Sequence, residues 1–183
     1  MRRLARLFSA LTLALIAVAV WLLWLAPGPR PLPVPPLSPS PPLTGQIDRI
    51  TIDKSDRRMT VWRGGQPVKT YAVALGFAPL GDKARQGDGK TPEGVFRIDR
   101  RNDRSAYHLS LGIDYPQASH RAAARAAGVD PGGDIFIHGQ PNQRPPGEVL
   151  PGDWTAGCIA ISDHDMREVF AATRIGTTVE IRP

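Results

Sequence analysis

The chain has 183 residues, enough for one domain with appended segments and a sizeable hydrophobic core. Its formal net charge of +6 is concentrated at the N-terminus, because residues 1–43 hold four arginines and no acidic residue, which leaves 19 basic and 17 acidic side chains in the remainder. This near balance does not support nucleic-acid binding, and we expect no nucleic acid partner.

A stretch without charged residues runs from Leu7 to Ala26, directly after three arginines. About 20 apolar residues are long enough to cross a bilayer as a helix, and Trp21 and Trp24 suit the membrane interface. We therefore predict that residues 1–26 form a signal anchor, a single-pass helix in the inner (cytoplasmic) membrane. The basic end stays in the cytoplasm, and the rest of the chain lies in the periplasm or extracytoplasmic space. The alternative is a cleaved signal peptide, which would yield a secreted form.

Residues 27–43 form a Pro-rich linker with nine of the chain's 19 prolines. Such a segment is extended and semi-rigid, and it holds no packed core. It acts either as a spacer of defined length between membrane and domain or as a disordered connection.

A folded domain is predicted for residues 44–183, with more strands than helices. Alternating apolar residues and turn signals predict strands at 46–53, 59–64, 68–76, 95–99, 134–139, 158–162 and 177–183. Helices are expected at 118–128 and 164–173, the second with Ser162 as its N-cap. Residues 76–94 and 141–154 read as long loops, which in compact domains are commonly functional. This pattern predicts a mainly β domain, not a doubly wound α/β fold.

Cys158 is the only cysteine, so it cannot form an intramolecular disulfide. A lone cysteine is often a small buried hydrophobic residue without chemistry. Two features favour a nucleophile instead: His138 ends a predicted strand, and Gly157 leaves room for backbone N–H groups near a reacting carbonyl. We expect a thiol activated in this way to be alkylated well below pH 8.5.

Three motifs in order resemble the L,D-transpeptidase catalytic domain family of the YkuD type. They are GKTPEGVFRI (89–98), IHG (137–139) and TAGCI (155–159), and the likeness covers about residues 46–182. The resemblance implies a β-sandwich domain with short helices, no cofactor, and activity on peptidoglycan peptides.

The resemblance also implies roles for individual residues. Cys158 would be the nucleophile and His138 the general acid and base, with the Gly139 backbone carbonyl orienting the imidazole. Gly157 would contribute its N–H to an oxyanion hole, and Thr155 would hold the turn.

Four residues are predicted to bind substrate: Thr155, Trp154, Tyr107 and Ser110. Asp134 and Asp153 flank the two catalytic segments, where each is either a loop-stabilising residue or a partner for a substrate amine. One cysteine and four scattered histidines do not supply a metal site, and we expect none.

The chain departs from the common family motif at Ala156 and Ala160, where polar residues are usual. Other stretches, such as PGGDIFIHG and DWTAGCIAIS, resemble a YafK-like subgroup that includes hydrolases. The sequence therefore predicts an L,D-transpeptidase that forms a Cys158 thioester in cell-wall cross-linking or remodelling. The first alternative is a hydrolase of the same fold that cleaves an L,D-linkage between peptidoglycan and a peptide or attached protein. The second is a non-catalytic peptidoglycan-binding module, and the oligomeric state stays open.

Overall fold

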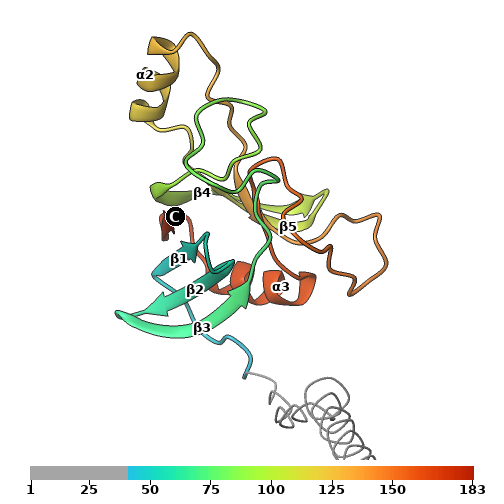
Figure 1. Cartoon of the computed structure of the whole chain (residues 1–183). Helices are drawn as coiled ribbons and strands as arrows, with labels where there is room; N and C mark the ends of the chain where they lie inside the picture. Colours follow the sequence, from blue (N-terminus) through green and yellow to red (C-terminus); the bar gives the residue numbers. More distant parts are fainter. Residues whose placement is uncertain (1–40) are drawn as a thin grey trace, which may run out of the picture. The chain divides into compact units, whose positions relative to one another are not determined.

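The computed structural model describes residues 41–183 (Figure 1). The predicted signal anchor and nearly all of the Pro-rich linker lie outside the described residues, so the boundaries proposed for them stay predictions. Among residues 41–183, no helix is both long and apolar enough to cross a membrane.

The described part contains eight strands and two helices, and this confirms the prediction of a mainly β domain with short helices. The strands are β1 (Arg49–Asp53), β2 (Arg58–Arg63), β3 (Gln66–Ala72), β4 (Gly94–Ser105), β5 (His108–Ile113), β6 (Phe136–His138), β7 (Ile159–Ala160) and β8 (Thr178–Arg182). The helices are α2 (Ala118–Ala126) and α3 (Asp163–Ala172).

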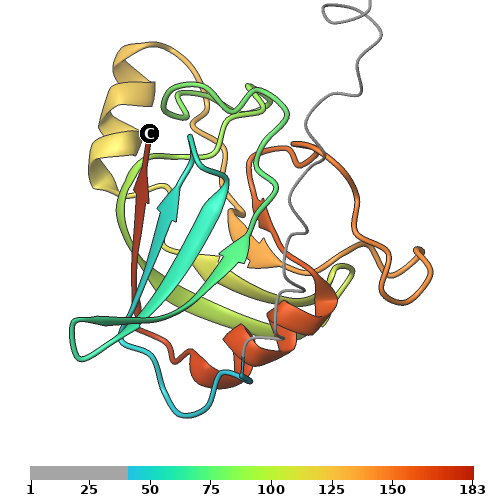
Figure 2. The same cartoon turned by 60° about the horizontal axis from the view of Figure 1, so that its bottom comes forward.

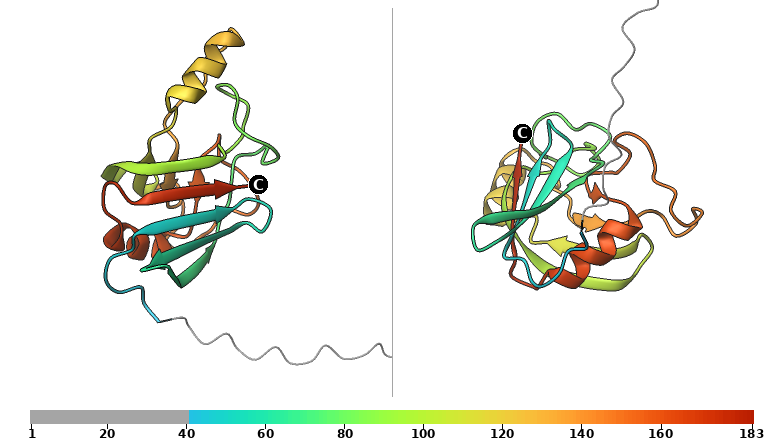
Figure 3. Two further views of the ribbon diagram at one scale, coloured as in Figure 1. Left: turned by 90° about the vertical axis from the view of Figure 1, so that its left-hand side faces the viewer. Right: turned by 90° about the horizontal axis from the view of Figure 1, so that it is seen from below.

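The eight strands form one sheet in the order β3-β2-β1-β8-β4-β5-β6-β7. β4 belongs to both halves of the sheet, because Gly94–Arg97 pair with β8 and the strand from Ile98 onward pairs with β5. The sheet curves strongly, so that β1–β3 and β8 lie opposite β5 and β6 (Figures 2 and 3). We expected a sandwich, and the structure instead builds its two facing layers from a single sheet that shares β4.

The two edges of this sheet meet next to Cys158. Ala74, just after β3, and Ala160 in β7 form an antiparallel bridge in which each N–H donates to the other's carbonyl at 2.8 Å. Gly76 and Thr155 form a second bridge nearby. The segment that carries the cysteine is therefore held from both sides, by β6 and by the chain that follows β3.

Aliphatic side chains fill the space inside the curved sheet. The largest fully buried residues are Ile50, Ile52, Met59, Leu75, Phe96, Ile98, Leu111, Ile113, Ile137, Ile159, Ile161 and Met166. Helix α3 adds Met166 and Val169 to this core. As predicted, its N-cap is Ser162, whose hydroxyl accepts the Asp165 N–H at 3.1 Å.

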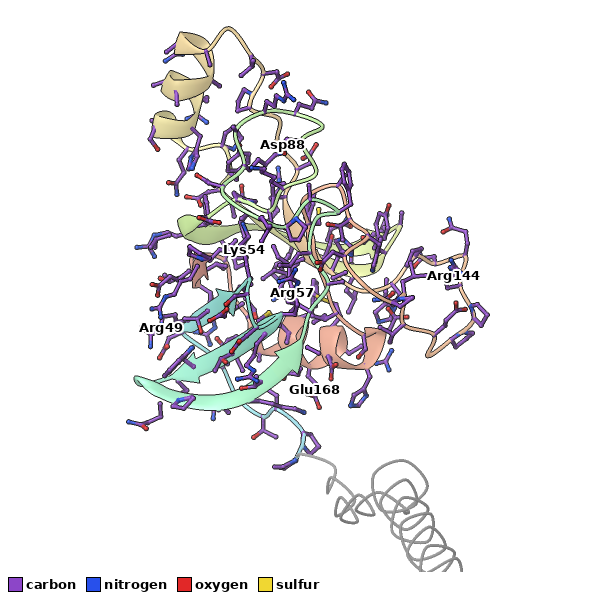
Figure 4. All side chains as sticks on the ribbon, viewed as in Figure 1. Arg49, Lys54, Arg57, Asp88, Arg144 and Glu168 are labelled. Carbon is purple, nitrogen blue, oxygen red and sulfur yellow. The ribbon has the colours of Figure 1, made fainter. Side chains whose placement is uncertain are left out.

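The loop over residues 76–94 has no regular structure but is held by a buried lysine. Lys54, labelled in Figure 4, is 2% exposed, and its ammonium donates to Gly81 O (2.7 Å), Thr91 O (3.0 Å) and Glu93 Oε1 (2.7 Å). A buried ammonium is stable only when all three protons have acceptors, and here they do. The loop is thereby fixed against the end of β1.

A second buried ion pair orders the tip of the same loop. Lys83 Nζ lies 2.8 Å from Asp88 Oδ1, and the carboxylate also accepts the N–H groups of Ala84, Arg85 and Lys90. Although burial acts in the opposite direction, these donors hold the pKa of Asp88 well below its usual range. The carboxylate is therefore charged at neutral pH, and the loop keeps one conformation.

Two features of the sheet differ from the sequence prediction. β4 extends to Ser105, beyond the strand predicted at 95–99 and through an exposed charged run, and β5 was not predicted at all. The arginines of the run lie over aromatic rings: the Arg100 guanidinium is 4.8 Å from the Phe136 ring centre, and that of Arg101 is 4.0 Å from Phe170.

Candidate functional site

Cys158 lies one residue before β7, at the end of a tight turn that begins at Thr155. Thr155 is buried, and its hydroxyl donates to Cys158 O at 2.7 Å while accepting the Gly157 N–H at 3.1 Å. Cys158 itself is half-buried, and its thiol donates to Asp134 O over 3.5 Å. The Thr155 side chain thus closes the turn that carries the thiol.

Gly157 is required at this turn for two independent reasons. Its φ is +139°, which side-chain-bearing residues rarely adopt, and a Cβ there would lie 2.7 Å from Lys90 O. The loop over residues 76–94 therefore packs directly against the backbone next to the cysteine.

We expect Gly157→Ala to lower the free energy of unfolding by about 1–3 kcal/mol, because strain and collision with a backbone carbonyl add up. Denaturant unfolding followed by circular dichroism measures this. The control is Gly152→Ala, whose φ is +68° but whose Cβ would have no atom within 4 Å. An equal loss for both variants would mean that the contact with Lys90 has no energetic role.

His138 ends β6 and is buried, with Nδ1 2.7 Å from Gly139 O. A carbonyl can only accept a hydrogen bond, so in the neutral imidazole Nδ1 carries the proton and Nε2 keeps a free lone pair. The Tyr107 ring lies 4.6 Å from the imidazole and the Trp154 ring 5.8 Å, measured between centres. The backbone fixes the tautomer, and the two aromatic rings fix the plane of the base.

Gly139 is held as tightly as the imidazole that it contacts. Its N–H is shared between Tyr107 O (3.0 Å) and Leu109 O (3.2 Å), and a Cβ on it would lie 2.5 Å from Asp163 Oδ1. No side chain fits here, so the carbonyl that faces His138 has little freedom to turn away.

Sequence reasoning missed Gln140, which ties the histidine segment to its surroundings. Its side chain is 2% exposed; Nε2 donates to Ile161 O at 2.7 Å, and Oε1 accepts the Leu150 N–H at 3.0 Å. Its backbone N–H donates to Asp163 Oδ1 at 2.7 Å. The only signal in the sequence was its position directly after IHG.

A pocket of about 430 Å³ brings most of the predicted site residues together. Six of the eight line it, namely Cys158, His138, Thr155, Trp154, Tyr107 and Ser110. Gly139 and Gly157 do not line it and instead support the histidine and the cysteine turn. The remaining lining residues were not predicted as site residues: Asn102, Ser105, Asp134, Phe136 and Ala156.

Burial keeps both reactive groups neutral in the resting protein. It raises the pKa of the Cys158 thiol, although the nearby Phe136 N–H works in the opposite direction. It also lowers the pKa of His138, more than the hydrogen bond to Gly139 O raises it. Desolvation thus acts against the predicted activation of the thiol below pH 8.5, which stays a prediction for alkylation to test.

Two backbone N–H groups next to the thiol differ in whether they are available to an oxyanion. The Gly157 N–H, predicted for an oxyanion hole, already donates to Thr155 Oγ1, so it can serve an oxyanion only by sharing its proton. The Cys158 N–H is used by no hydrogen bond within residues 41–183, which leaves it free to donate.

Asp153, one of the two acids considered for a substrate amine, is used for structure instead. It forms an ion pair with Arg57 (labelled in Figure 4) at 2.8 Å and accepts the Leu75 N–H at 2.9 Å. This residue therefore anchors the end of the loop over residues 141–154 to the start of β2.

The other histidines lie outside the pocket. His120 lines a separate cavity of about 720 Å³ between α2 and the loop over residues 76–94, where it accepts the Gln117 N–H and stacks on Phe96. His164 lies on α3 near Glu168, whose carboxylate is paired with Lys69 at 2.6 Å. The ligand atoms of His164, Asp165 and Glu168 lie within 4.8 Å of one another, but the Glu168 carboxylate is already paired with Lys69.

Comparisons with known proteins agree with this geometry. Residues 47–181 match the YkuD family, described as the L,D-transpeptidase catalytic domain. YafK of Escherichia coli (strain K12) is 27% identical over 134 residues, which are 70% of this chain and 48% of that protein. The chain thus spans about half the length of the curated relatives it matches.

Solved structures show the same fold. The helical cell shape determining protein Pgp2 of Campylobacter jejuni matches with a TM-score of 0.58 and 24% identity, over 75% of this chain and 48% of that one. Bd1075 of Bdellovibrio bacteriovorus matches with a TM-score of 0.53 and 22% identity, over 79% and 53% of the two chains.

Proposed function

Because this chain belongs to the YkuD family of L,D-transpeptidase catalytic domains, we propose that it is a cysteine acyltransferase acting on peptidoglycan stem peptides. The observation that carries the proposal is the shared pocket, which both Cys158 and His138 line, His138 at the end of β6 and Cys158 directly before the neighbouring strand β7. The free lone pair on His138 Nε2 supports its role as the base.

The proposed reaction starts from the neutral pair. His138 Nε2 takes the thiol proton as Cys158 Sγ attacks a peptide carbonyl, and the oxyanion that forms is stabilised by the Cys158 N–H. The C–N bond then breaks, the leaving amine takes the proton from His138, and a thioester remains on the sulfur.

The second half of the reaction regenerates the enzyme. An acceptor amine attacks the thioester and gives a proton to His138, the C–S bond breaks, and the proton returns to the sulfur. Each step moves one proton between the sulfur, the imidazole and an amine, so the reaction needs no cofactor. The product is a new amide, as in cross-linking or remodelling of the wall.

Hydrolysis of an L,D-linkage is the second candidate, in which water resolves the same thioester. It is favoured by Ala156, which lines the pocket beside Cys158 with a methyl group and offers an acceptor amine no hydrogen bond.

The proposal is tested by incubating the full-length protein, solubilised in detergent, with peptidoglycan fragments and analysing the products by mass spectrometry. Cross-linked or exchanged peptides indicate transfer, whereas a net gain of water indicates hydrolysis. If wall fragments bind but no product and no thioester forms, the chain is a binding module and the enzymatic proposal is wrong.

The proposed location is the outer side of the inner membrane, with residues 1–26 as an anchor. The length of the uncharged stretch and the arginines before it support this location. Fractionation of cells that express the full chain tests it: the protein should stay in the membrane pellet after a salt wash and be digested by protease added to spheroplasts. Recovery as a shorter, soluble periplasmic protein would instead indicate a cleaved signal.

A further inference from the structure

Asp134 directly precedes the β6 segment that carries the base, and it lies beside the nucleophile. Its backbone carbonyl accepts the Cys158 thiol at 3.5 Å, and the residue lines the Cys158 pocket. Its side chain is 84% exposed, so the carboxylate stands in solvent at the rim. A negative charge is therefore held within reach of any substrate bound to the thiol.

When no substrate is bound, the Asp134 carboxylate disfavours ionisation of the Cys158 thiol. Its charge contributes to the raised pKa of Cys158, since a nearby anion disfavours the thiolate. Its backbone also has a φ of +54°, a left-handed conformation that is uncommon outside glycine. The charge is unfavourable for the thiolate without a ligand, and a bound cation would offset it.

Arg100, which lies next to Asp134, leaves part of the Asp134 carboxylate available to a ligand. Arg100 lies 3.6 Å from the Asp134 carboxylate, but it is also 3.5 Å from Asp99 and stacks on the Phe136 ring. It packs over Gly112, where a Cβ would lie 2.6 Å from Arg100 Nε. The guanidinium is thus held on the sheet and shared between two acids, and the second Asp134 oxygen is free to accept from a ligand.

We infer that Asp134 is a specificity-determining residue that binds a primary ammonium group of the peptide substrate at the rim of the Cys158 pocket. The inference rests on the proposed acyl transfer. Of the two acids that the sequence suggested for a substrate amine, it selects Asp134, because the Asp153 carboxylate is already paired with Arg57 and accepts the Leu75 N–H. The ammonium belongs either to a diamino acid residue of the acyl donor or to the acceptor, which releases one proton to solvent before its neutral amine attacks the thioester.

The test is Asp134→Asn in the full-length protein, because asparagine tolerates the left-handed conformation and only the charge is lost. The first arm measures kcat/KM for thioester formation by intact-protein mass spectrometry, using a synthetic tetrapeptide donor with a free side-chain amine and the same peptide with that amine acetylated. If the donor carries the ammonium, kcat/KM should fall about fivefold for the free amine and should not fall for the acetylated peptide.

The second arm measures how the thioester partitions between glycinamide and water. If the acceptor carries the ammonium, the ratio of amide to acid should fall about fivefold in Asp134→Asn. The matched control is Asp56→Asn, which removes an exposed carboxylate paired with Arg58 and does not touch the pocket or Arg100. It should leave both measurements unchanged.

The outcomes separate this inference from the proposed function. If the wild-type protein forms a thioester and Asp134→Asn changes neither measurement, the inference is wrong and the acyl transfer stands. An equal fall for free and acetylated donors would also overturn it, because the loss would then be structural. If no donor forms a thioester with the wild-type protein, both the function and the inference fail.

Discussion

Cys158→Ala should abolish the thioester and reduce turnover of peptidoglycan peptides by about three orders of magnitude or more, because Cys158 is the only thiol in the chain. The half-buried thiol makes only weak hydrogen bonds to backbone groups of Asp134 and Phe136, so its removal should cost less than about 1 kcal/mol of unfolding free energy. Intact-protein mass spectrometry after mixing with a peptide donor measures the first effect, and thermal unfolding the second.

The control is Cys158→Ser, which keeps the size of the side chain and replaces the sulfur by a weaker nucleophile. It should bind donor peptide with unchanged affinity while forming no adduct. Turnover in either variant within tenfold of the wild-type value would contradict the role of Cys158.

The second large effect is expected for His138→Gln, which should reduce turnover by about 10²–10⁴-fold through loss of the general base. Because burial lowers the pKa of His138 from its ordinary value of about 6.5, the imidazole is neutral and competent at pH 7. Wild-type kcat/KM should therefore be constant between about pH 6.5 and pH 7. It should fall only below about pH 6.5, where acid protonates the buried ring.

Alkylation of Cys158 by iodoacetamide reports the state of the thiol directly. Since its pKa is raised, labelling should be slow at pH 6–7 and increase above about pH 8.5, and His138→Gln should leave this midpoint in place. His164→Gln, on the exposed surface of α3, is the control for replacing a histidine. A wild-type labelling midpoint well below pH 8.5 that moves upward in His138→Gln would show a preformed thiolate–imidazolium pair instead.

The sequence was sufficient for most strands, because β1, β2 and β8 have one buried face and therefore alternate. β5 was missed because its last four residues are all buried and show no alternation, and because His108 begins it with a φ of +65°. The charged part of β4 was missed because the partners of its arginines are aromatic rings far away in the chain.

The candidate site also has features that the sequence reveals and features that depend on the whole fold. Cys158, His138 and the glycines beside them lie in short motifs and could be found, but their protonation could not, since burial depends on the whole fold. Lys54 and Asp134 owe their importance to groups 27 and 24 residues away. Asp153 was a candidate for substrate binding because, like Asp134, it flanks a catalytic segment in the sequence. Its ion pair with Arg57 and its hydrogen bond to Leu75 show that its role is structural.

The position of β8 has a consequence for the order in which this protein acquires its site. Its residues Thr178–Arg182 pair with β1 in parallel and with β4 in antiparallel orientation, so the middle of the sheet is completed by the end of the domain. The partners in the β1–β8 pairing are 129 residues apart (Arg49 and Thr178), and pairing over such a distance makes folding slow and dependent on the whole domain. A chain still in transit through a membrane has no central strand, and its thiol has no pocket. If the chain is exported as we propose, acyl transfer should therefore begin only after export is complete.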